Sequence, residues 1–284
     1  MVTLDNDTRP ETDMLNTAKR AVMELCRWGE VLFLVAVYPL MAISRVRRLA
    51  FRFAREGLRH QIPIVPLAKV VNASLTDDAQ ITLQAVPERV HNCTMFELFT
   101  LAALTRAVNP LLCLEIGTYD GRSALAIAAN CRPQTKVTAL NLPPDYVKNH
   151  PEHNGVVDVQ LSVKVQSGER WVGREGNQKI QQVFANSLDF DFASIGKPQL
   201  IFIDGAHDEP AVALDTRNAM QIVDRNNGLV LWHDARDFGV RPVLRDLFQQ
   251  GLPVSIIEHT NIAILQFRNG QPVNWLQRQT NGVA

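Results

Sequence analysis

Cysteine, excess charge and long apolar runs are all scarce in this sequence. Only four cysteines occur among 284 residues, with no C-x-x-C pair and no tight cluster with histidine, which argues against a zinc site and favours a reducing, cytoplasmic compartment. Basic and acidic side chains balance at 29 each, so the formal net charge is zero. Because recognition of nucleic acid through its phosphates needs a basic surface, we expect no nucleic-acid partner.

The sequence also lacks an apolar run that could comfortably cross a membrane. Residues 31–43 form an apolar run of 13 residues. A spanning helix needs roughly 20 such residues, and Pro39 would kink this one. Residues 1–20 are polar and partly acidic, unlike the start of a signal peptide, and they predict a disordered tail.

Residues 21–60 combine the apolar run with a basic helical pattern. Arginine recurs at spacings of three and four, which places these side chains on one helix face, at Arg45, Arg48, Arg52, Arg55 and Arg59. A basic amphipathic helix beside an apolar run is typical of a membrane-surface element, so residues 31–59 predict peripheral contact with the cytoplasmic face of a membrane. The alternative is packing against the rest of the chain or a second subunit, which would favour a homo-oligomer.

The remaining chain predicts a connector at residues 61–90 and one catalytic domain at residues 91–284. A helix is expected at 94–108, and strands then alternate with helices. The predicted strands are 111–116, 136–140, 199–203, 228–232, 254–258 and 262–267, and the predicted helices are 123–129, 179–182, 209–223 and 240–250. This α/β alternation indicates a Rossmann-like, doubly wound, mostly parallel sheet with an antiparallel hairpin of the last two strands at its edge.

A glycine loop follows the first strand of this sheet, in the segment Leu114-Glu115-Ile116-Gly117-Thr118-Tyr119-Asp120-Gly121-Arg122-Ser123. Gly117 permits a tight turn and the close approach of a ligand, and open α/β sheets bind ligands where such strands end. The third glycine of a pyrophosphate cradle is missing, and the Glu115 carboxylate would repel a diphosphate. The loop therefore favours a cationic ligand such as S-adenosylmethionine (SAM), which carries an ammonium and a sulfonium.

The order of the motifs resembles the class I SAM-dependent methyltransferases, in particular the small, catechol-type O-methyltransferases. The matching pieces are residues 114–123, Asn186-Ser187, residues 201–207 (Ile-Phe-Ile-Asp-Gly-Ala-His) and residues 228–234 (Gly-Leu-Val-Leu-Trp-His-Asp). The resemblance covers about residues 90–268. It implies transfer of a methyl group from SAM to a hydroxyl oxygen of a small molecule, a sugar or a lipid-linked acceptor.

The resemblance also implies the cofactor-binding residues. Glu115 and Gly117 would line the methionine part of SAM, and Asn141, at the tip of the second strand, would face the ribose. Asn141 stands where an acid is usual, and the alternative is an ordinary turn residue. The other residues that would lie against SAM are Thr118, Tyr119, Gly121, Ser123, Asn186, Ser187 and Asp204.

Two aspartates at the tips of adjacent strands predict the reaction centre. Neighbouring strands lie about 4.8 Å apart, so the carboxylates of Asp204 and Asp234 can converge on one divalent cation such as Mg²⁺. His233 is a further candidate ligand, although strand alternation could point it away. His207 matches the position of the family's general base, and imidazole titrates near neutrality.

Ala235 stands where metal-dependent relatives often carry another ligand. A metal could therefore be absent, or its site could be completed by His207, His233 or water, and the two aspartates could instead cap local structure. Two other functions stay open. One is a nicotinamide-linked dehydrogenase, and the other is a weakly active or inactive SAM-fold protein that serves as a membrane-attached interaction module.

Overall fold

The computed structural model describes residues 62–72, 74–164 and 166–276, which belong to one compact unit that begins at Ile62. The predicted tail at 1–20 and the predicted helical extension at 21–60 lie outside the described residues. Among the described residues, no helix combines the length and the apolarity needed to cross a bilayer.

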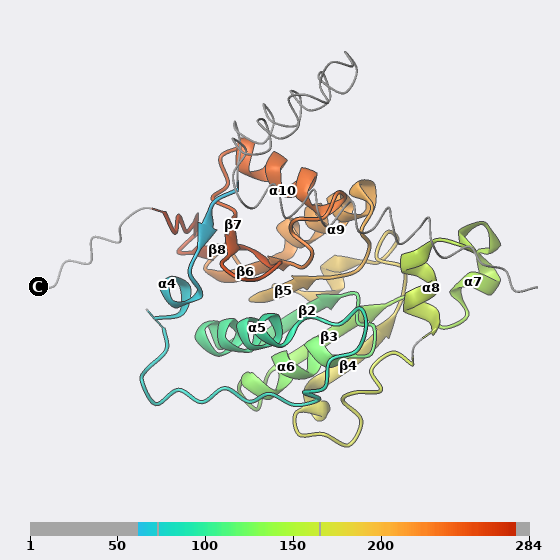
Figure 1. The fold of residues 1–284 in the computed structure, drawn as a ribbon, viewed down its shortest axis with the longest axis horizontal. Coiled ribbons are helices and arrows are strands. Elements are labelled where there is room, and N and C mark those ends of the chain that lie inside the picture. Colours follow the sequence, from blue (N-terminus) through green and yellow to red (C-terminus); the bar gives the residue numbers. More distant parts are fainter. Residues whose placement is uncertain (1–61, 73, 165, 277–284) are drawn as a thin grey trace, which may run out of the picture. The chain divides into compact units, whose positions relative to one another are not determined.

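The strands form one mixed sheet in the order β1-β7-β8-β6-β5-β2-β3-β4, and β9 pairs with β8 (Figure 1). Neighbouring strands run parallel except at β8, which runs antiparallel to its partners. The strands are β1 (Ile64–Val65), β2 (Leu112–Ile116), β3 (Lys136–Asn141), β4 (Ile180–Phe184), β5 (Leu200–Ile203), β6 (Asn227–Trp232), β7 (Ser255–Ile257), β8 (Ala263–Arg268) and β9 (Gln271–Pro272). The carboxyl ends of β2, β3, β4, β5 and β6 therefore meet at one edge.

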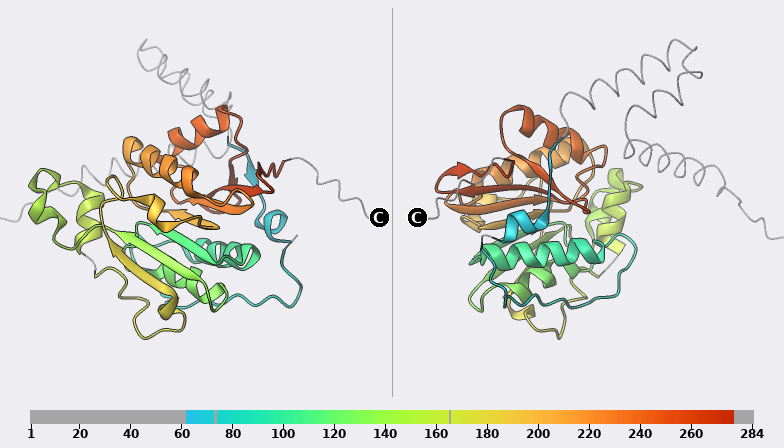
Figure 2. Two further views of the ribbon diagram at one scale, coloured as in Figure 1. Left: turned by 180° about the vertical axis from the view of Figure 1, so that it is seen from behind. Right: turned by 60° about the vertical axis from the view of Figure 1, so that its left-hand side comes forward.

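Helices cover both faces of the sheet (Figures 1 and 2). One face carries α4 (Leu67–Val71), α5 (Met95–Val108) and α6 (Arg122–Asn130), and the other carries α9 (Glu209–Ile222) and α10 (Val240–Gln249). Two further helices, α7 (Tyr146–Asn149) and α8 (Val157–Lys164), follow β3 at the carboxyl edge. Short 3-10 turns lie at Pro151–His153, Asn177–Lys179 and Phe192–Ile195.

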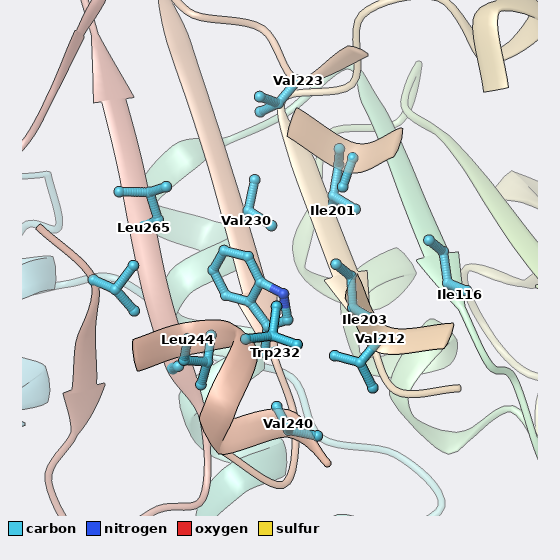
Figure 3. Close-up of a cluster of buried hydrophobic side chains, with 14 of the residues drawn as sticks. Ile116, Ile201, Ile203, Val212, Val223, Val230, Trp232, Val240, Leu244 and Leu265 are labelled. Carbon is cyan, nitrogen blue, oxygen red and sulfur yellow. The ribbon is translucent and has the colours of Figure 1, made fainter. Parts of the chain in front are cut away.

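Alternate residues of the central strands supply two apolar cores. In β5, Ile201 and Ile203 join the core under α9 and α10, whereas Leu200 and Phe202 join the core under α5 and α6. This period of two explains why the strands read as continuous apolar runs, because both of their faces are buried. Trp232 lies at the centre of the first core (Figure 3), and its indole Nε1 donates to Thr216 Oγ1 at 2.8 Å.

The alternation predicted from the sequence is confirmed, and so is the mostly parallel, Rossmann-like sheet. The predicted helix at 179–182 is wrong, because these residues start β4 after a short 3-10 turn. The strand β4 can contain the polar residues Gln181 and Gln182 because it lies at the edge of the sheet and is only partly buried. Its pairing with β3 outweighs the helix propensity of glutamine. The β7–β8 hairpin is present, and β1 lies outside it at the edge of the sheet.

Candidate active site

The glycine loop joins β2 to α6 at the carboxyl edge of the sheet. Its backbone is left-handed at Gly117, Tyr119 and Gly121, with φ of +89°, +48° and +90°. A Cβ atom at Gly117 would stand 2.1 Å from the backbone oxygen of Asp204. The Gly117 amide donates to the Leu140 oxygen at 2.9 Å, so the loop is held between the ends of β3 and β5.

We expect Gly117→Ala to lower the free energy of unfolding by about 2–4 kcal/mol, because the new Cβ would overlap the Asp204 carbonyl and the backbone would be strained. Gly155→Ala is the matched control, since its φ is +104° and nothing lies within 4 Å of the added Cβ. We expect the control to lose about 1 kcal/mol. Urea unfolding measures both, and equal losses would show that the close approach at Gly117 contributes nothing.

The Glu115 carboxyl group lies directly before the loop and is fully buried. Neither of its oxygens makes a hydrogen bond within the described part of the chain. Burial raises the pKa of Glu115 to about 8, although the nearby hydroxyls of Ser123 and Thr118 oppose the rise. Only these two neutral hydroxyls oppose the desolvation of the carboxyl group, and no cation pairs with it among the described residues, so it favours a ligand that brings a positive charge.

Two buried arginines fasten the segment 85–93 beside the loop. Arg122 is 2% exposed and donates to three backbone oxygens of that segment, those of Ala85, Cys93 and Val86, at 3.0, 2.5 and 2.7 Å. Arg170 donates to the oxygens of Ala85 and Pro87 and lies 3.6 Å from Asp120. The sequence analysis assigned no role to either arginine, because an isolated arginine in a sequence does not reveal its distant carbonyl partners.

Asn141 lies at the end of β3, as predicted, and is buried. Its Oδ1 accepts from the Thr118 amide at 3.4 Å, and its Nδ2 donates to the Ser162 oxygen of α8 at 3.3 Å. The amide group therefore ties the glycine loop to α8. Its contact with a ribose stays a prediction.

Asn186 and Ser187 follow β4 at the same edge of the sheet. Asn186 Nδ2 donates to the Tyr146 hydroxyl at 3.1 Å. Ser187 hydrogen-bonds Asp215 of α9, a buried carboxyl group whose Oδ1 has no partner and whose pKa burial raises to about 6. Asp215 is thus a further buried acid at this edge, and no sequence motif pointed to it.

Asp204 and Asp234 do converge, as predicted from the strand tips. His233 Nδ1 lies 3.1 Å from Asp204 Oδ1 and 3.2 Å from Asp234 Oδ2. His233 faces both acids because Asp234 adopts a left-handed backbone, with φ of +50°, which turns its carboxylate back. On the other side, His233 Nε2 lies 3.3 Å from Glu97 Oε2.

Glu97 is a site residue that sequence reasoning missed. It forms a capping box with Thr94 at the start of α5, and the T-x-x-E pattern alone explains it as a helix cap. In the fold it also accepts from the Asn261 amide at 2.7 Å and pairs with His233. Burial raises its pKa, but the hydrogen bond and charge of His233, together with backbone hydrogen bonds from Thr94 and Asn261, outweigh burial and lower the pKa to about 2.

His207 lies between two carboxylates. Its Nε2 lies 2.7 Å from Asp234 Oδ2, and its Nδ1 lies 3.2 Å from Asp158 Oδ1. Hydrogen bonds to Asp158 and then Asp234 raise the pKa of His207 to about 10. The sequence analysis expected a pKa near neutrality, and the difference arises from Asp158, an α8 residue that no motif singled out. The role of His207 as general base stays a prediction.

The position after Asp234 shows how the fold compensates for Ala235. Ala235 is fully buried, and its amide donates to the backbone oxygen of Asn261. Asn261 in turn donates from its side-chain Nδ2 to Asp234 Oδ1 at 2.9 Å. An amide side chain from the β7–β8 turn, that of Asn261, therefore lies beside Asp234, although residue 235 itself is an alanine and carries no amide.

The donors at this edge suit a divalent cation chemically. One ligand atom each of Asp204, His207 and Asp234 lies within 4.8 Å of the others. Carboxylates with an imidazole form a donor set that divalent metals accept. His233 contacts both carboxylates, so it could enter the same set.

Comparison with known proteins supports the pattern of motifs. A family model described as a methyltransferase domain matches residues 114–235. The O-methyltransferase TomG from Streptomyces achromogenes, solved with SAM, is 14% identical with a TM-score of 0.46, and the match covers 72% of this chain and 96% of that chain. A search of curated proteins found no match.

Two further solved structures are similar. The O-methyltransferase from Bacillus cereus, in complex with S-adenosylhomocysteine (SAH), is 14% identical with a TM-score of 0.42, and the match covers 71% of this chain and 89% of that chain. The SAH-bound methyltransferase PaMTH1 from Podospora anserina is 16% identical with a TM-score of 0.43, with 80% and 97% covered.

The family match spans the glycine loop, Asp204, His207 and Asp234, and the sheet has the mostly parallel, doubly covered architecture expected from these motifs. Residues 114–235, the stretch that carries these motifs, therefore match a methyltransferase domain.

Proposed function

We propose that the chain transfers the methyl group of SAM to a hydroxyl oxygen of an acceptor that lies against the His207–Asp234 pair. One observation carries the proposal. The buried carboxyl group of Glu115, which pairs with no cation among the described residues, lies on the same sheet edge as a cluster of carboxylates and imidazoles. The first group suits the cationic amino acid part of the donor, and the second suits a hydroxyl that must lose a proton.

SAM fits the residues at this edge. The Glu115 carboxylate would pair with its ammonium, and Gly117 leaves the backbone open to the methionine part. Asn141 would contact the ribose through the hydrogen bonds that its side-chain amide can still make beside those to the Thr118 and Ser162 backbone. The Ser187 hydroxyl and Asn186 would lie near the adenine, with Asp215 holding Ser187 in place.

The chemistry needs positioning and one proton acceptor. The acceptor oxygen attacks the methyl carbon, the carbon–sulfur bond breaks, and its electron pair neutralises the sulfonium to give SAH. The hydroxyl proton becomes strongly acidic as the new carbon–oxygen bond forms. This proton can therefore pass to the carboxylates around His207. The His207 side chain is 35% exposed, so the proton can return from this cluster to water.

We also propose that Asp204 and Asp234 hold a divalent cation such as Mg²⁺, with His207 or His233 in reach. A cation bound there would lower the pKa of the acceptor hydroxyl. The support is the converging donor set, and the test is methyl transfer before and after treatment with EDTA. Activity that EDTA leaves unchanged, after dialysis shows no retained metal, would contradict this part.

The Glu115 proposal predicts how SAH affinity depends on pH. Below the raised pKa of about 8 the carboxyl group is neutral and cannot pair with the ammonium. Affinity should therefore rise by up to about tenfold per pH unit from pH 6.5 and level off above pH 8. The same shift makes the unliganded fold less stable as pH rises from 4.5 to about 8, because the unfolded chain releases its proton first.

Calorimetry with SAH at several pH values measures this dependence. Glu115→Gln keeps the shape but cannot ionise, so its affinity should be weaker at pH 8.5 and nearly flat with pH. Ser194→Ala, an exposed change in a distant turn, is the control. If the SAH affinity of Glu115→Gln still rose with pH as in the natural chain, the titrating group would be one other than Glu115.

The acceptor class is tested by transfer of a radiolabelled methyl group from SAM to a panel of sugars, phenols and lipid-linked glycans. We expect alkali-stable, ether-linked label on hydroxyl-bearing members alone. Label that appears only on amines or thiols would contradict the proposed oxygen acceptor.

Peripheral membrane contact through residues 31–59 is a further proposal, and it rests on the arginine spacing beside the apolar run at residues 31–43. We expect the full chain to bind vesicles of anionic lipid more tightly than neutral vesicles. The combined variant Arg48→Gln, Arg52→Gln and Arg55→Gln should lose that preference. Equal binding of the variant and the natural chain to anionic vesicles would contradict this proposal.

A further inference from the structure

A second group of possible metal ligands lies after β3, away from the two aspartates. The turn after α7 brings together His150, Glu152 and His153, and one ligand atom of each lies within 4.8 Å of the others. His150 Nδ1 is 3.4 Å from Glu152 Oε1. The three side chains come from four consecutive residues, so the turn itself fixes their separation.

A buried aromatic ring holds the two imidazoles in place. Tyr146 is 6% exposed, and its ring stacks on His150 with centroids 4.3 Å apart and on His153 with centroids 5.7 Å apart. The two imidazole planes differ by 17°. These contacts restrict the histidine rotamers, so less conformational entropy is lost when the pair binds a ligand than for two free surface histidines.

The Tyr146 hydroxyl also contacts one imidazole, in a geometry compatible with the tautomer that a metal ligand needs. Its oxygen lies 3.1 Å from His153 Nδ1, and it accepts from Asn186 Nδ2 at 3.1 Å. A phenol oxygen can accept two hydrogen bonds, so it can take one from Asn186 and one from His153 Nδ1–H. That tautomer leaves the lone pair of His153 on Nε2. Metal-binding histidines are typically held in this way by a partner on the other ring nitrogen.

We propose that His150, Glu152 and His153 form a site for a borderline transition-metal ion of the zinc class. Two imidazoles and one carboxylate match the ligands that zinc prefers, whereas Mg²⁺ and Ca²⁺ prefer oxygen ligands throughout. The side chains are partly exposed, so water can take the remaining position. A bound ion would join α7 to the turn that follows it, at the edge where β3 and β4 end.

Zinc binding by the full chain tests this site directly. The natural chain is titrated with Zn²⁺ at pH 7.5 against a chromogenic chelator, and Asp234→Asn is titrated in parallel because the aspartate cluster could take an ion of its own. We expect a tight equivalent that persists in Asp234→Asn, and the variants that follow are made in that background so that the aspartate cluster does not contribute. His150→Gln and His153→Gln should each abolish it, and Tyr146→Phe should weaken it by about 10- to 100-fold.

His259→Asn is the control, since His259 is an exposed histidine elsewhere and asparagine suits its left-handed backbone. Thermal unfolding without zinc checks that each variant folds. Tight binding that survives His150→Gln and His153→Gln would overturn the proposal. So would binding that is weakened equally by His259→Asn, because the affinity would then belong to surface histidines in general.

Discussion

Asp234→Asn lowers kcat for methyl transfer by about 10²- to 10⁴-fold, whichever acceptor the panel identifies. The Asp234 carboxylate bonds His207, lies 3.2 Å from His233 and accepts from Asn261, so it joins both imidazoles of the site. Those histidines hold its pKa well below the ordinary value despite burial, which shows that the charged form is the one they require. Asparagine keeps the shape and removes the charge.

The control for this change is Asp237→Asn, three residues further along. Asp237 is a surface residue, partial desolvation and the nearby Asp234 charge raise the pKa of its carboxyl group, and it makes no hydrogen bond to either histidine. We expect its kcat to stay within a few-fold of the natural value. SAH affinity should be retained in both variants, because the donor is held at the glycine loop. Full activity in Asp234→Asn would remove this cluster from the reaction.

Arg122→Met lowers the free energy of unfolding by about 3–5 kcal/mol. The change leaves the buried backbone oxygen of Cys93 and the part-buried oxygen of Val86 without their donor, and it removes one of two donors to Ala85. Each unpaired buried carbonyl costs about 1–3 kcal/mol, and methionine fills most of the lost volume.

Arg132→Met is the matched control for the arginine. Arg132 also donates to a backbone oxygen, that of Asn109, but it is partly exposed, so water can replace it. We expect a loss below about 1 kcal/mol. Urea unfolding compares the two variants, provided that the unfolding free energy depends equally on urea concentration in both. A loss for Arg122→Met as small as for the control would show that the segment 85–93 does not depend on this side chain.

The parts of the fold that the sequence predicts are those with strong local signals. Buried parallel strands read as apolar runs, and Gly117 and Gly121 mark the loop where the backbone must turn left-handed. The sequence predicts that Asp204 and Asp234 lie close together because the tips of adjacent strands have a fixed spacing. The strand β4 was not predicted because an edge strand can carry polar side chains, here the exposed Gln181 and the half-buried Gln182.

The missing parts of the site depend on contacts between distant segments. Glu97 looks like a helix cap, and Asp158 lies in residues 157–164, which alternate apolar and polar residues as a strand would although they form α8. Asn261 lies in a turn 27 residues after Asp234, where no spacing rule applies. The environment of His207 was unpredictable for the same reason, since its raised pKa needs Asp158 as well as Asp234.

The most direct test of the account is a calorimetric titration of the full chain with SAH at pH 7, in two buffers of different ionisation enthalpy. If the buried Glu115 carboxyl group takes up the ammonium, it must ionise as the ligand binds, because its pKa in the free protein is about 8. We predict binding with release of close to one proton, and no release in Glu115→Gln. Absence of binding, or binding without proton release in the natural chain, would contradict the account.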